Sequence, residues 1–324
     1  MTAFLCCACG TSYPDASRQP ERCPICEDER QFIPTLGQAW ISRDALASTH
    51  RNAWRRHEPD LLSLQTVPAF AIDQRAFLLR TPEGNILWDC IALLDAATED
   101  LVRGLGGLSM MAISHPHYYT AMQDWAAAFD APIYLHAADR DWVMRPSPHA
   151  RFWDSETLEL GSTVTLIRTG GHFAGGTVLH WSGTADGAGA LLVGDIVQVA
   201  PGARTVSFMW SYPNMMPLPG AEIRQIASRL APLGYDRIYG AFAGQEVAQG
   251  GPAIVARSAA RYVELLERGG PGYPAGPGKE GSLENRQAPD EGGRIPSRAQ
   301  PGILGEPEAE TGYRSVKRPG NDRL

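Results

Sequence analysis

Short runs of apolar residues alternate with turn residues along the middle of the chain, and they have the length of β-strands. Three such runs, TVPAFAI, AFLLRT and NILWDC, begin at Thr66, Ala76 and Asn85, and the turn PEGN separates the second from the third. Runs spaced in this way predict an antiparallel meander. Further strands are predicted at 163–168, 177–181 and 190–195. The chain therefore carries two separate groups of strands.

Helical spacing occurs between and after these strands. Four apolar residues recur at offsets of three and four: Met122, Trp125, Ala126 and Phe129. This spacing predicts a helix with one apolar stripe. Similar patterns predict helices over 223–230 and 255–266, and another helix is predicted over 93–103. Two facing sheets with helices on their outer sides are the expected architecture.

The composition adds limits on size and partners. The chain has 324 residues, 44% of them hydrophobic, and a net charge of −7. This length suffices for one catalytic domain of about 200 residues with a full core and small appendages. Because acidic and basic residues are interspersed, no basic patch for nucleic acid or anionic lipid is present. A small-molecule substrate is therefore expected.

The sequence also predicts a location. No apolar stretch approaches the roughly 18 residues of a membrane span, and no charged region followed by an apolar region marks an export signal at the N-terminus. We therefore expect a cytoplasmic protein without a membrane partner.

Four of the six cysteines form two CxxC pairs near the N-terminus. Cys6 and Cys9 make the first pair, and Cys23 and Cys26 make the second. Four thiolates suit tetrahedral zinc, which can fold a segment too small to have a core of its own. Two disulfides are the alternative, but a reducing cytoplasm disfavours them. The pattern therefore predicts a zinc ribbon over residues 1–30, with a structural Zn²⁺.

Three further segments follow the ribbon. Residues 31–64 are expected to be a connector with a short helix, for which Ser42 is the N-cap. Residues 65–268 contain the predicted strands and helices and form the catalytic domain. Residues 269–324 are rich in Gly, Pro and charged residues and poor in large apolar residues, so a disordered tail is predicted there.

Four residues suited to binding a metal follow predicted strands. His115 and His117 end the apolar run that begins at Leu108, His172 follows a pair of glycines, and Asp195 ends the run ALLVGD. Two histidines with one residue between them can face one ion, because side chains in an extended chain have a period of two. Neutral imidazoles with one carboxylate suit zinc or ferrous iron. The sequence thus predicts one metal site.

The order HxH, GGH and GD, each at the end of a strand, resembles the metallo-β-lactamase superfamily of αββα hydrolases. The resemblance extends over residues 66–268. The first motif of that family usually reads HxHxDH, whereas this chain has Tyr119 in place of the aspartate and Thr120 in place of the last histidine. The late histidine of the family is also missing, because no histidine follows His180. The ligands of the second metal are therefore lost.

The resemblance implies an αββα sandwich with one catalytic metal, held by His115, His117, His172 and Asp195. Zinc bound to three histidines lowers the pKa of a bound water to about 7 and so provides hydroxide at neutral pH. Asp195 is expected to bind the metal and orient the water. Tyr119 or Tyr118 is expected to donate a hydrogen bond to a developing oxyanion, with simple packing as the alternative.

An aromatic and methionine-rich segment follows Asp195. Its residues Phe208, Trp210 and Tyr212, together with Tyr118, are candidates for an apolar substrate pocket. A hydrophobic contact between the subunits of a homodimer is the alternative for the same segment.

The favoured function is hydrolysis of a small ester, thioester or lactone with one catalytic Zn²⁺. Two alternatives stay open. His115, His172 and Asp195 match the Fe²⁺ ligands of the persulfide dioxygenase branch, which would mean oxygen chemistry. A zinc-ribbon adaptor that is not catalytic is the other. Metal analysis separates the three hypotheses.

Overall fold

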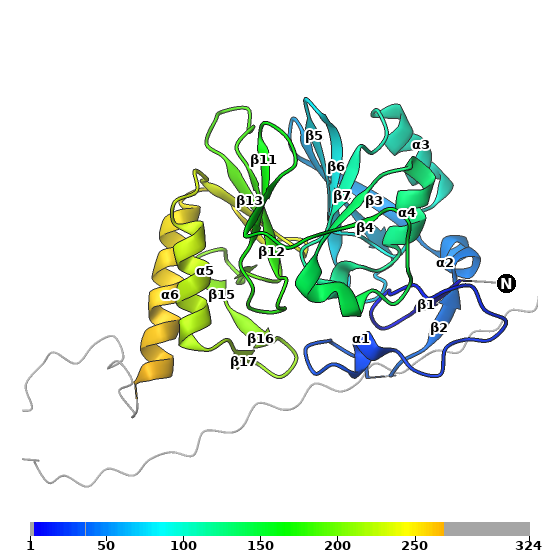
Figure 1. The fold of residues 1–324 in the computed structure, drawn as a ribbon, viewed down its shortest axis with the longest axis horizontal. Coiled ribbons are helices and arrows are strands. Elements are labelled where there is room, and N and C mark those ends of the chain that lie inside the picture. The colour runs from blue at the N-terminus through cyan, green and yellow to red at the C-terminus, as the bar shows by residue number, and fades with distance from the viewer. Residues whose placement is uncertain (1–2, 36, 269–324) are drawn as a thin grey trace, which may run out of the picture. The chain divides into compact units, whose positions relative to one another are not determined.

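Two mixed β-sheets face each other in the computed structural model, which describes residues 3–35 and 37–268 (Figure 1). The tail predicted over 269–324 lies outside the described residues. No helix within these two ranges has the length and hydropathy needed to cross a membrane.

The first sheet has seven strands whose spatial order follows the chain. Neighbouring strands are antiparallel from β3 to β6 and parallel from β6 to β9. The strands are β3 (Arg51–Glu58), β4 (Leu61–Val67), β5 (Arg75–Thr81), β6 (Gly84–Trp88), β7 (Met110–Ala112), β8 (Ile133–His136) and β9 (Ala150–Trp153). The predicted meander is thus confirmed for β5 and β6.

The second sheet has six strands in the order β10-β11-β12-β13-β18-β19. In this sheet only β13 and β18 are parallel. The strands are β10 (Thr157–Glu159), β11 (Val164–Arg168), β12 (Thr177–Trp181), β13 (Ala190–Gly194), β18 (Arg237–Gly240) and β19 (Glu246–Val247). All three strands predicted over 163–195 therefore belong to one sheet.

Apolar side chains on both faces of each sheet explain the continuous apolar runs. On β5, Phe77 points into the cluster between the sheets, whereas Leu78 points into the cluster under the helices. Leu192 and Leu191 divide in the same way on β13. A strand buried on both faces loses the apolar and polar alternation of a half-exposed strand.

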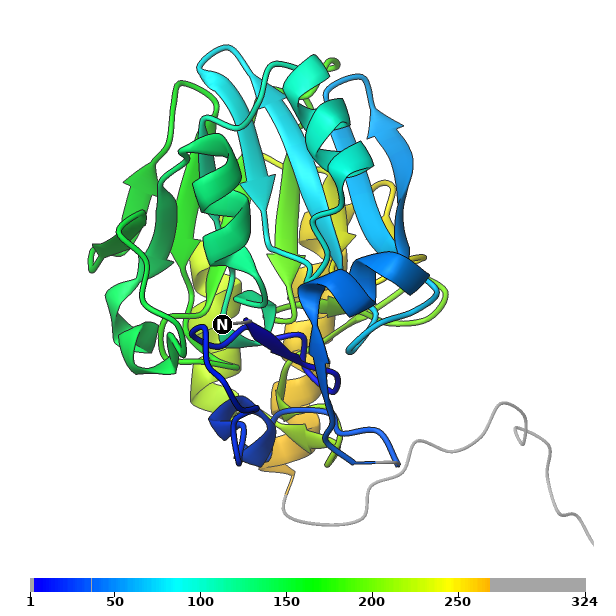
Figure 2. The same cartoon turned by 90° about the vertical axis from the view of Figure 1, so that its right-hand side faces the viewer.

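The helices cover the outer face of each sheet. Helices α3 (Ala96–Gly104) and α4 (Met122–Phe129) pack on the first sheet (Figure 2), and α5 (Gly220–Leu230) and α6 (Gly251–Glu267) pack on the second. Trp125 of α4 and Ile223 of α5 are fully buried at these contacts. The predicted αββα sandwich, with its helices near the predicted positions, is confirmed.

The first sheet begins earlier than the sequence indicates. The segment 31–64, expected to be a connector, contains β2 (Trp40–Ser42), α2 (Arg43–Thr49), β3 and part of β4. Ser42 does cap α2, because its hydroxyl accepts a hydrogen bond from the amide of Ala45. However, the polar stretch after the helix is an edge strand. Charged side chains are common on edge strands, where they hide the strand pattern.

A buried arginine joins the two sheets. Arg75 of β5 donates two hydrogen bonds to the carbonyl oxygen of Gly240, at 3.0 and 2.8 Å, and its Nη1 lies 2.5 Å from Glu246 Oε1 on β19. The Arg75 side chain is only 1% exposed. The guanidinium is therefore shielded from solvent, while its partner Glu246 is 21% exposed.

Replacing Arg75 by methionine is expected to lower the free energy of unfolding by about 3–5 kcal/mol, because it leaves the partners of a buried ion pair uncompensated. Denaturant unfolding measures this change. Arg80→Met on the same strand is the matched control, since the exposed Arg80–Asp60 pair contributes at most about 1 kcal/mol. Equal effects of the two substitutions would contradict the structural role of Arg75.

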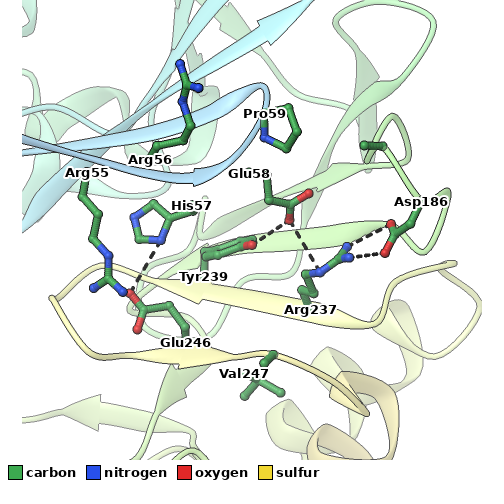
Figure 3. A pocket seen from close by; sticks show the side chains of 12 residues that line it. Arg55, Arg56, His57, Glu58, Pro59, Asp186, Arg237, Tyr239, Glu246 and Val247 are labelled. Carbon is green, nitrogen blue, oxygen red and sulfur yellow. Dashed lines mark hydrogen bonds and ion pairs between the residues drawn. The ribbon is translucent and has the colours of Figure 1, made fainter.

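A polar cavity of about 460 Å³ lies beside this junction (Figure 3). Its charged groups pair with one another: Tyr239 donates to Glu58 at 2.6 Å, and Arg237 pairs with Asp186. Arg237 pairs in register with Ala190 at the start of β13. The cavity is therefore at the end of the sheet opposite to Asp195, which follows β13.

His57 in this cavity makes stability depend on pH. Burial, with a smaller effect of Arg75, lowers its pKa from 6.5 to about 4. The folded state thus binds the proton more weakly than the unfolded state, so stability is lost as the pH falls from about 6.5 to about 4. His57→Gln is expected to reduce this loss, measured as the difference in urea midpoint between pH 7 and pH 4.5. An unchanged difference would exclude His57 as its source.

Candidate metal centre

The four predicted metal ligands meet at one end of the two sheets. His115 and His117 follow β7, His172 lies between β11 and β12, and Asp195 follows β13. One ligand atom of each residue lies within 4.8 Å of those of the other three, and all four side chains are buried. We call these four residues the His–Asp centre.

Local backbone features place the first two ligands. The carboxylate of Asp89 accepts a hydrogen bond from the amide of Ser114 at 2.8 Å, which holds the chain where it leaves β7. Pro116 then begins a short 3-10 helix, η1 (Pro116–Tyr118). Proline is favoured at the first position of a helix, since its nitrogen has no hydrogen to leave unpaired. His115 and His117 therefore lie on either side of one tight turn.

Two glycines bring the other ligands close. Gly171 has a φ of +89°, which a side chain would disfavour, and it directs His172 inward. Gly194 has a φ of +53°, and a Cβ there would lie 2.4 Å from Ser114 Oγ. The end of β13 can therefore approach the end of β7 only with glycine at 194, and this approach brings Asp195 to His115.

The three imidazole rings form a nearly regular triangle. The ring centroids lie 5.1 Å apart in all three pairs. His172 Nε2 lies 3.3 Å from His117 Nδ1, and His115 Nε2 lies 3.8 Å from Asp195 Oδ2. Nitrogen atoms and one carboxylate oxygen thus surround a common point.

Hydrogen bonds on the far side of two rings fix which nitrogen faces that point. His172 Nδ1 lies 2.8 Å from the carbonyl oxygen of Trp210 and so donates to it. His115 Nδ1 lies 2.9 Å from Ser114 Oγ. Such bonds orient imidazoles that bind metal ions. Among the described residues, His115 Nε2 is buried without a hydrogen-bond partner, and a cation at the centre would satisfy it.

Burial sets the charge state of the centre. It lowers the pKa values of His115 and His117 well below 6.5, and it lowers that of His172 to about 4, with the positive charge of Arg30 adding to the effect. The imidazoles are therefore neutral at pH 7, as metal binding requires. Burial also raises the pKa of Asp195 to about 7. A cation would favour the ionised carboxylate.

The predicted tyrosines differ in their positions. The ring of Tyr118 lies 4.5 Å from that of His115, and its hydroxyl lies beside the Asp195 carboxyl without a well-aligned hydrogen bond. Tyr119 lies in the apolar cluster under the helices, and no aromatic contact joins its ring to His115 within the described ranges. Tyr118 is therefore better placed for a catalytic role than Tyr119, whose role stays a prediction.

The residues predicted to line the substrate pocket lie in different parts of the structure. Tyr212 donates a hydrogen bond to the carbonyl oxygen of Asp195 at 2.8 Å. The backbone carbonyl of Trp210 accepts the hydrogen bond from His172 Nδ1. Phe208, by contrast, is fully buried against Tyr262 in the cluster under α5 and α6. Phe208 lies between two short strands, Val206–Ser207 and Met209–Ser211, and its ring belongs to the core rather than to the centre.

Sequence reasoning missed Arg30, which contacts the centre from a distant part of the chain. Its Nη1 donates to the carbonyl oxygen of His172 at 3.0 Å. It also lines a cavity of about 380 Å³ together with Arg168, Gly171 and Trp210. No sequence pattern marks Arg30, because it lies 142 residues before His172 and belongs to no metal motif.

The four cysteines form a second candidate metal site. Their sulfur atoms lie within 4.8 Å of one another, with Cys6 and Cys26 3.5 Å apart and Cys9 and Cys23 3.6 Å apart. All four are free thiols. Tetrahedral zinc with bonds of about 2.3 Å requires sulfur atoms roughly 3.8 Å apart, whereas a disulfide requires about 2.05 Å. The donor set therefore fits a metal ion.

We call residues 3–35, which hold these cysteines, the four-cysteine unit. It contains β1 (Phe4–Cys6) and α1 (Pro24–Glu27). Tyr13 donates a hydrogen bond to Cys23 Sγ at 3.0 Å. Cys7 does not belong to the cluster, although it lies within the first CxxC pair.

Comparisons with known proteins give one match in sequence and several matches in fold. No family model matches the chain. The chain is 44% identical over 268 residues to the uncharacterised protein YmaE of Bacillus subtilis (strain 168), which covers 82% of this chain and 97% of YmaE. Similar solved structures include the metallo-β-lactamase SMB-1 in a complex with mercaptoacetic acid, at 17% identity and a TM-score of 0.47, covering 66% of this chain and 95% of that chain. VMB-1 matches at 10% identity and a TM-score of 0.49, covering 66% and 98%.

Proposed function

The chain belongs to the same family as YmaE of Bacillus subtilis, and from its αββα fold of the metallo-β-lactamase type and its His–Asp centre we propose that it is a metal-dependent hydrolase. The observation that carries the proposal is the convergence of three neutral imidazoles and one carboxylate, within 4.8 Å, from three separate loops. Three imidazoles suit zinc with a fourth position left for water, which the carboxylate of Asp195 can orient.

One catalytic metal ion follows from the residues of the first motif. Tyr119 and Thr120 stand where a second ion would need an aspartate and a histidine. Both side chains are buried. Neither a neutral phenol nor a threonine hydroxyl is a ligand of choice for zinc. Buried side chains that do not bind zinc therefore occupy the positions of the ligands of a second ion.

Zinc is the proposed ion, and when bound to three histidines it provides hydroxide at neutral pH. A ferrous site of the dioxygenase type needs only two histidines and one carboxylate. Here His117 Nδ1 faces His172 Nε2 at 3.3 Å, so the third histidine takes part in the centre. This geometry favours zinc and hydrolysis over iron and oxygen chemistry.

The residues around the centre have distinct roles in this proposal. Asp195 accepts a hydrogen bond from Gln198 Nε2 at 3.5 Å and orients the attacking water. Tyr118 has a free hydroxyl beside Asp195 and can donate to the oxyanion that forms at the substrate carbonyl. Tyr212 holds the backbone of Asp195 in place.

The proposed substrates are small esters, thioesters or lactones. The cavity beside Gly171 has a volume of about 380 Å³, within the usual range of about 300–1,000 Å³ for small-molecule sites. Its lining combines the Trp210 ring with the charged groups of Arg30 and Arg168. Such a surface suits a small acyl compound that carries polar groups.

Two measurements test the proposed function. Elemental analysis of protein purified without added metal should find zinc at two equivalents per chain, one for each site, and a screen of thioesters, lactones and aryl esters should find hydrolysis. Asp195→Asn should abolish that hydrolysis, and Asp186→Asn in the distant cavity serves as the control. Iron at the His–Asp centre, or hydrolysis that persists in Asp195→Asn, would overturn the proposal.

A further inference from the structure

The four-cysteine unit contacts two of the loops that carry metal ligands. The amide of Ser12 donates to the carbonyl oxygen of Thr120 at 2.9 Å, in the loop that begins with His115. Gly10 packs against the same residue, since a Cβ at Gly10 would lie 3.3 Å from Thr120 Cγ2. The second contact is that of Arg30 with His172. The unit therefore bridges loops that are far apart in the chain.

Arg30 is held in one position by charge and by aromatic rings. The carboxylate of Asp28 accepts hydrogen bonds from its Nε at 2.6 Å and from its Nη2 at 2.8 Å. Its guanidinium carbon lies 3.8 Å from the ring centroid of Phe173 and 4.5 Å from that of Trp210. The side chain is only 8% exposed. Planar stacking combined with a two-point bond is specific to arginine, because lysine has neither the plane nor the fork.

Glu29, the residue before Arg30, holds the segment that orients the ring of His172. The backbone carbonyl of Glu29 accepts hydrogen bonds from Ser211 at 2.7 Å and from Asn214 at 2.9 Å, and its carboxylate accepts one from Trp210 Nε1 at 2.8 Å. Trp210 in turn supplies the carbonyl that orients His172 Nδ1. Residues 28–30 thus fix both the backbone of His172 and the partner of its ring.

We propose that the four-cysteine unit forms part of the catalytic site and that Arg30 is a positioning residue for His172. Arg30 transmits the order of the four-cysteine unit to the His–Asp centre, so that the affinity of the centre for its metal depends on this unit being folded. The proposal rests on the proposed function only in that it assumes a metal at the His–Asp centre.

Cobalt titration of the full-length apoprotein tests this role without any substrate. Co²⁺ at four thiolates gives an intense sulfur-to-metal band in the near ultraviolet, whereas Co²⁺ at imidazoles and a carboxylate gives only weak visible bands, so the two sites are read separately. Arg30→Gln is expected to weaken Co²⁺ binding at the His–Asp centre by about 10- to 100-fold, as is usual when a group that orients a metal ligand is lost. The thiolate band should be unchanged.

Arg22→Gln is the matched control, since Arg22 lies on the same unit but is exposed and, among the residues that the structure describes, pairs only with Glu27. It should leave both sites unaltered. Arg30→Lys should also weaken the centre, because a lysine ammonium can neither make the two-point bond to Asp28 nor stack as a plane on the rings of Phe173 and Trp210. If Arg30→Gln misfolds and loses the thiolate band, the Co²⁺ affinity of the His–Asp centre in Arg30→Lys tests the positioning role instead.

Two results would overturn the proposal, and they differ from each other. Wild-type affinity at the His–Asp centre in Arg30→Gln or in a folded Arg30→Lys would reject the positioning role and leave the hydrolase proposal intact. A wild-type protein that binds Co²⁺ only at the thiolates would reject both proposals.

Discussion

Replacing His115 by alanine is expected to remove the catalytic metal and to lower kcat/KM by at least about 1,000-fold, which corresponds to about 4 kcal/mol of lost transition-state stabilisation. His115 is 1% exposed, and its Nε2 has no partner within the described chain other than the proposed ion. Alanine has no donor atom, and the buried site offers no replacement. Elemental analysis should find one metal equivalent instead of two, and initial rates on the best substrate measure the loss.

His149→Ala is the control for this experiment. His149 is a partly exposed residue in a loop, where it lies 3.7 Å from Asp130. It should keep both metal equivalents and the wild-type rate. If His115→Ala retained two equivalents and full activity, the His–Asp centre could not be the catalytic site.

Replacing Cys23 by alanine is expected to unfold the four-cysteine unit. This unit has a small apolar cluster in which three of the six buried residues are cysteines and the others are Ala8, Tyr13 and Ile25. In small zinc-binding peptides the metal contributes about 10–16 kcal/mol to folding. A unit of this size has no comparable source of stability. Limited proteolysis should therefore cut residues 3–35 in Cys23→Ala, and the metal content should fall by at least one equivalent.

Cys7→Ala is the matched control, because Cys7 lies between two cluster cysteines but contributes no ligand atom. It should retain the metal and resist proteolysis like the wild type. Cleavage in both variants, or in neither, would contradict a structural metal held by Cys6, Cys9, Cys23 and Cys26.

The sequence predicted those parts of the fold whose signal is local. Apolar runs and helical spacing predicted β5, β6 and the helices α4, α5 and α6, because burial on one face or on both leaves a periodic pattern. Strand β3 was not predicted, because it is an edge strand with many polar side chains and is held in the sheet by its pairing with β4. Likewise, the run from Thr66 ends as a strand at Val67, since Pro68 has no amide hydrogen for the sheet.

The position of each side chain at the site required the tertiary structure. Tyr118 and Tyr119 are adjacent and both are buried, and only the 3-10 turn after His115 decides that the ring of Tyr118 is the one that contacts His115. Phe208 was predicted to line a pocket, yet its side chain lies in the core cluster against Tyr262. The composition of the segment does not show this difference, because Phe208, Trp210 and Tyr212 are all aromatic.

The sequence by itself identified the groups that can bind a metal: four thiols form one set, three imidazoles with a carboxylate form another, and Tyr119 and Thr120 stand where the HxHxDH pattern has an aspartate and a histidine. Only the tertiary structure showed that Arg30 of the four-cysteine unit contacts the loop that carries His172. Arg30 and His172 are 142 residues apart, and their contact depends on the packing of whole elements. Ligand types are properties of single residues, whereas such a contact is a property of the folded chain.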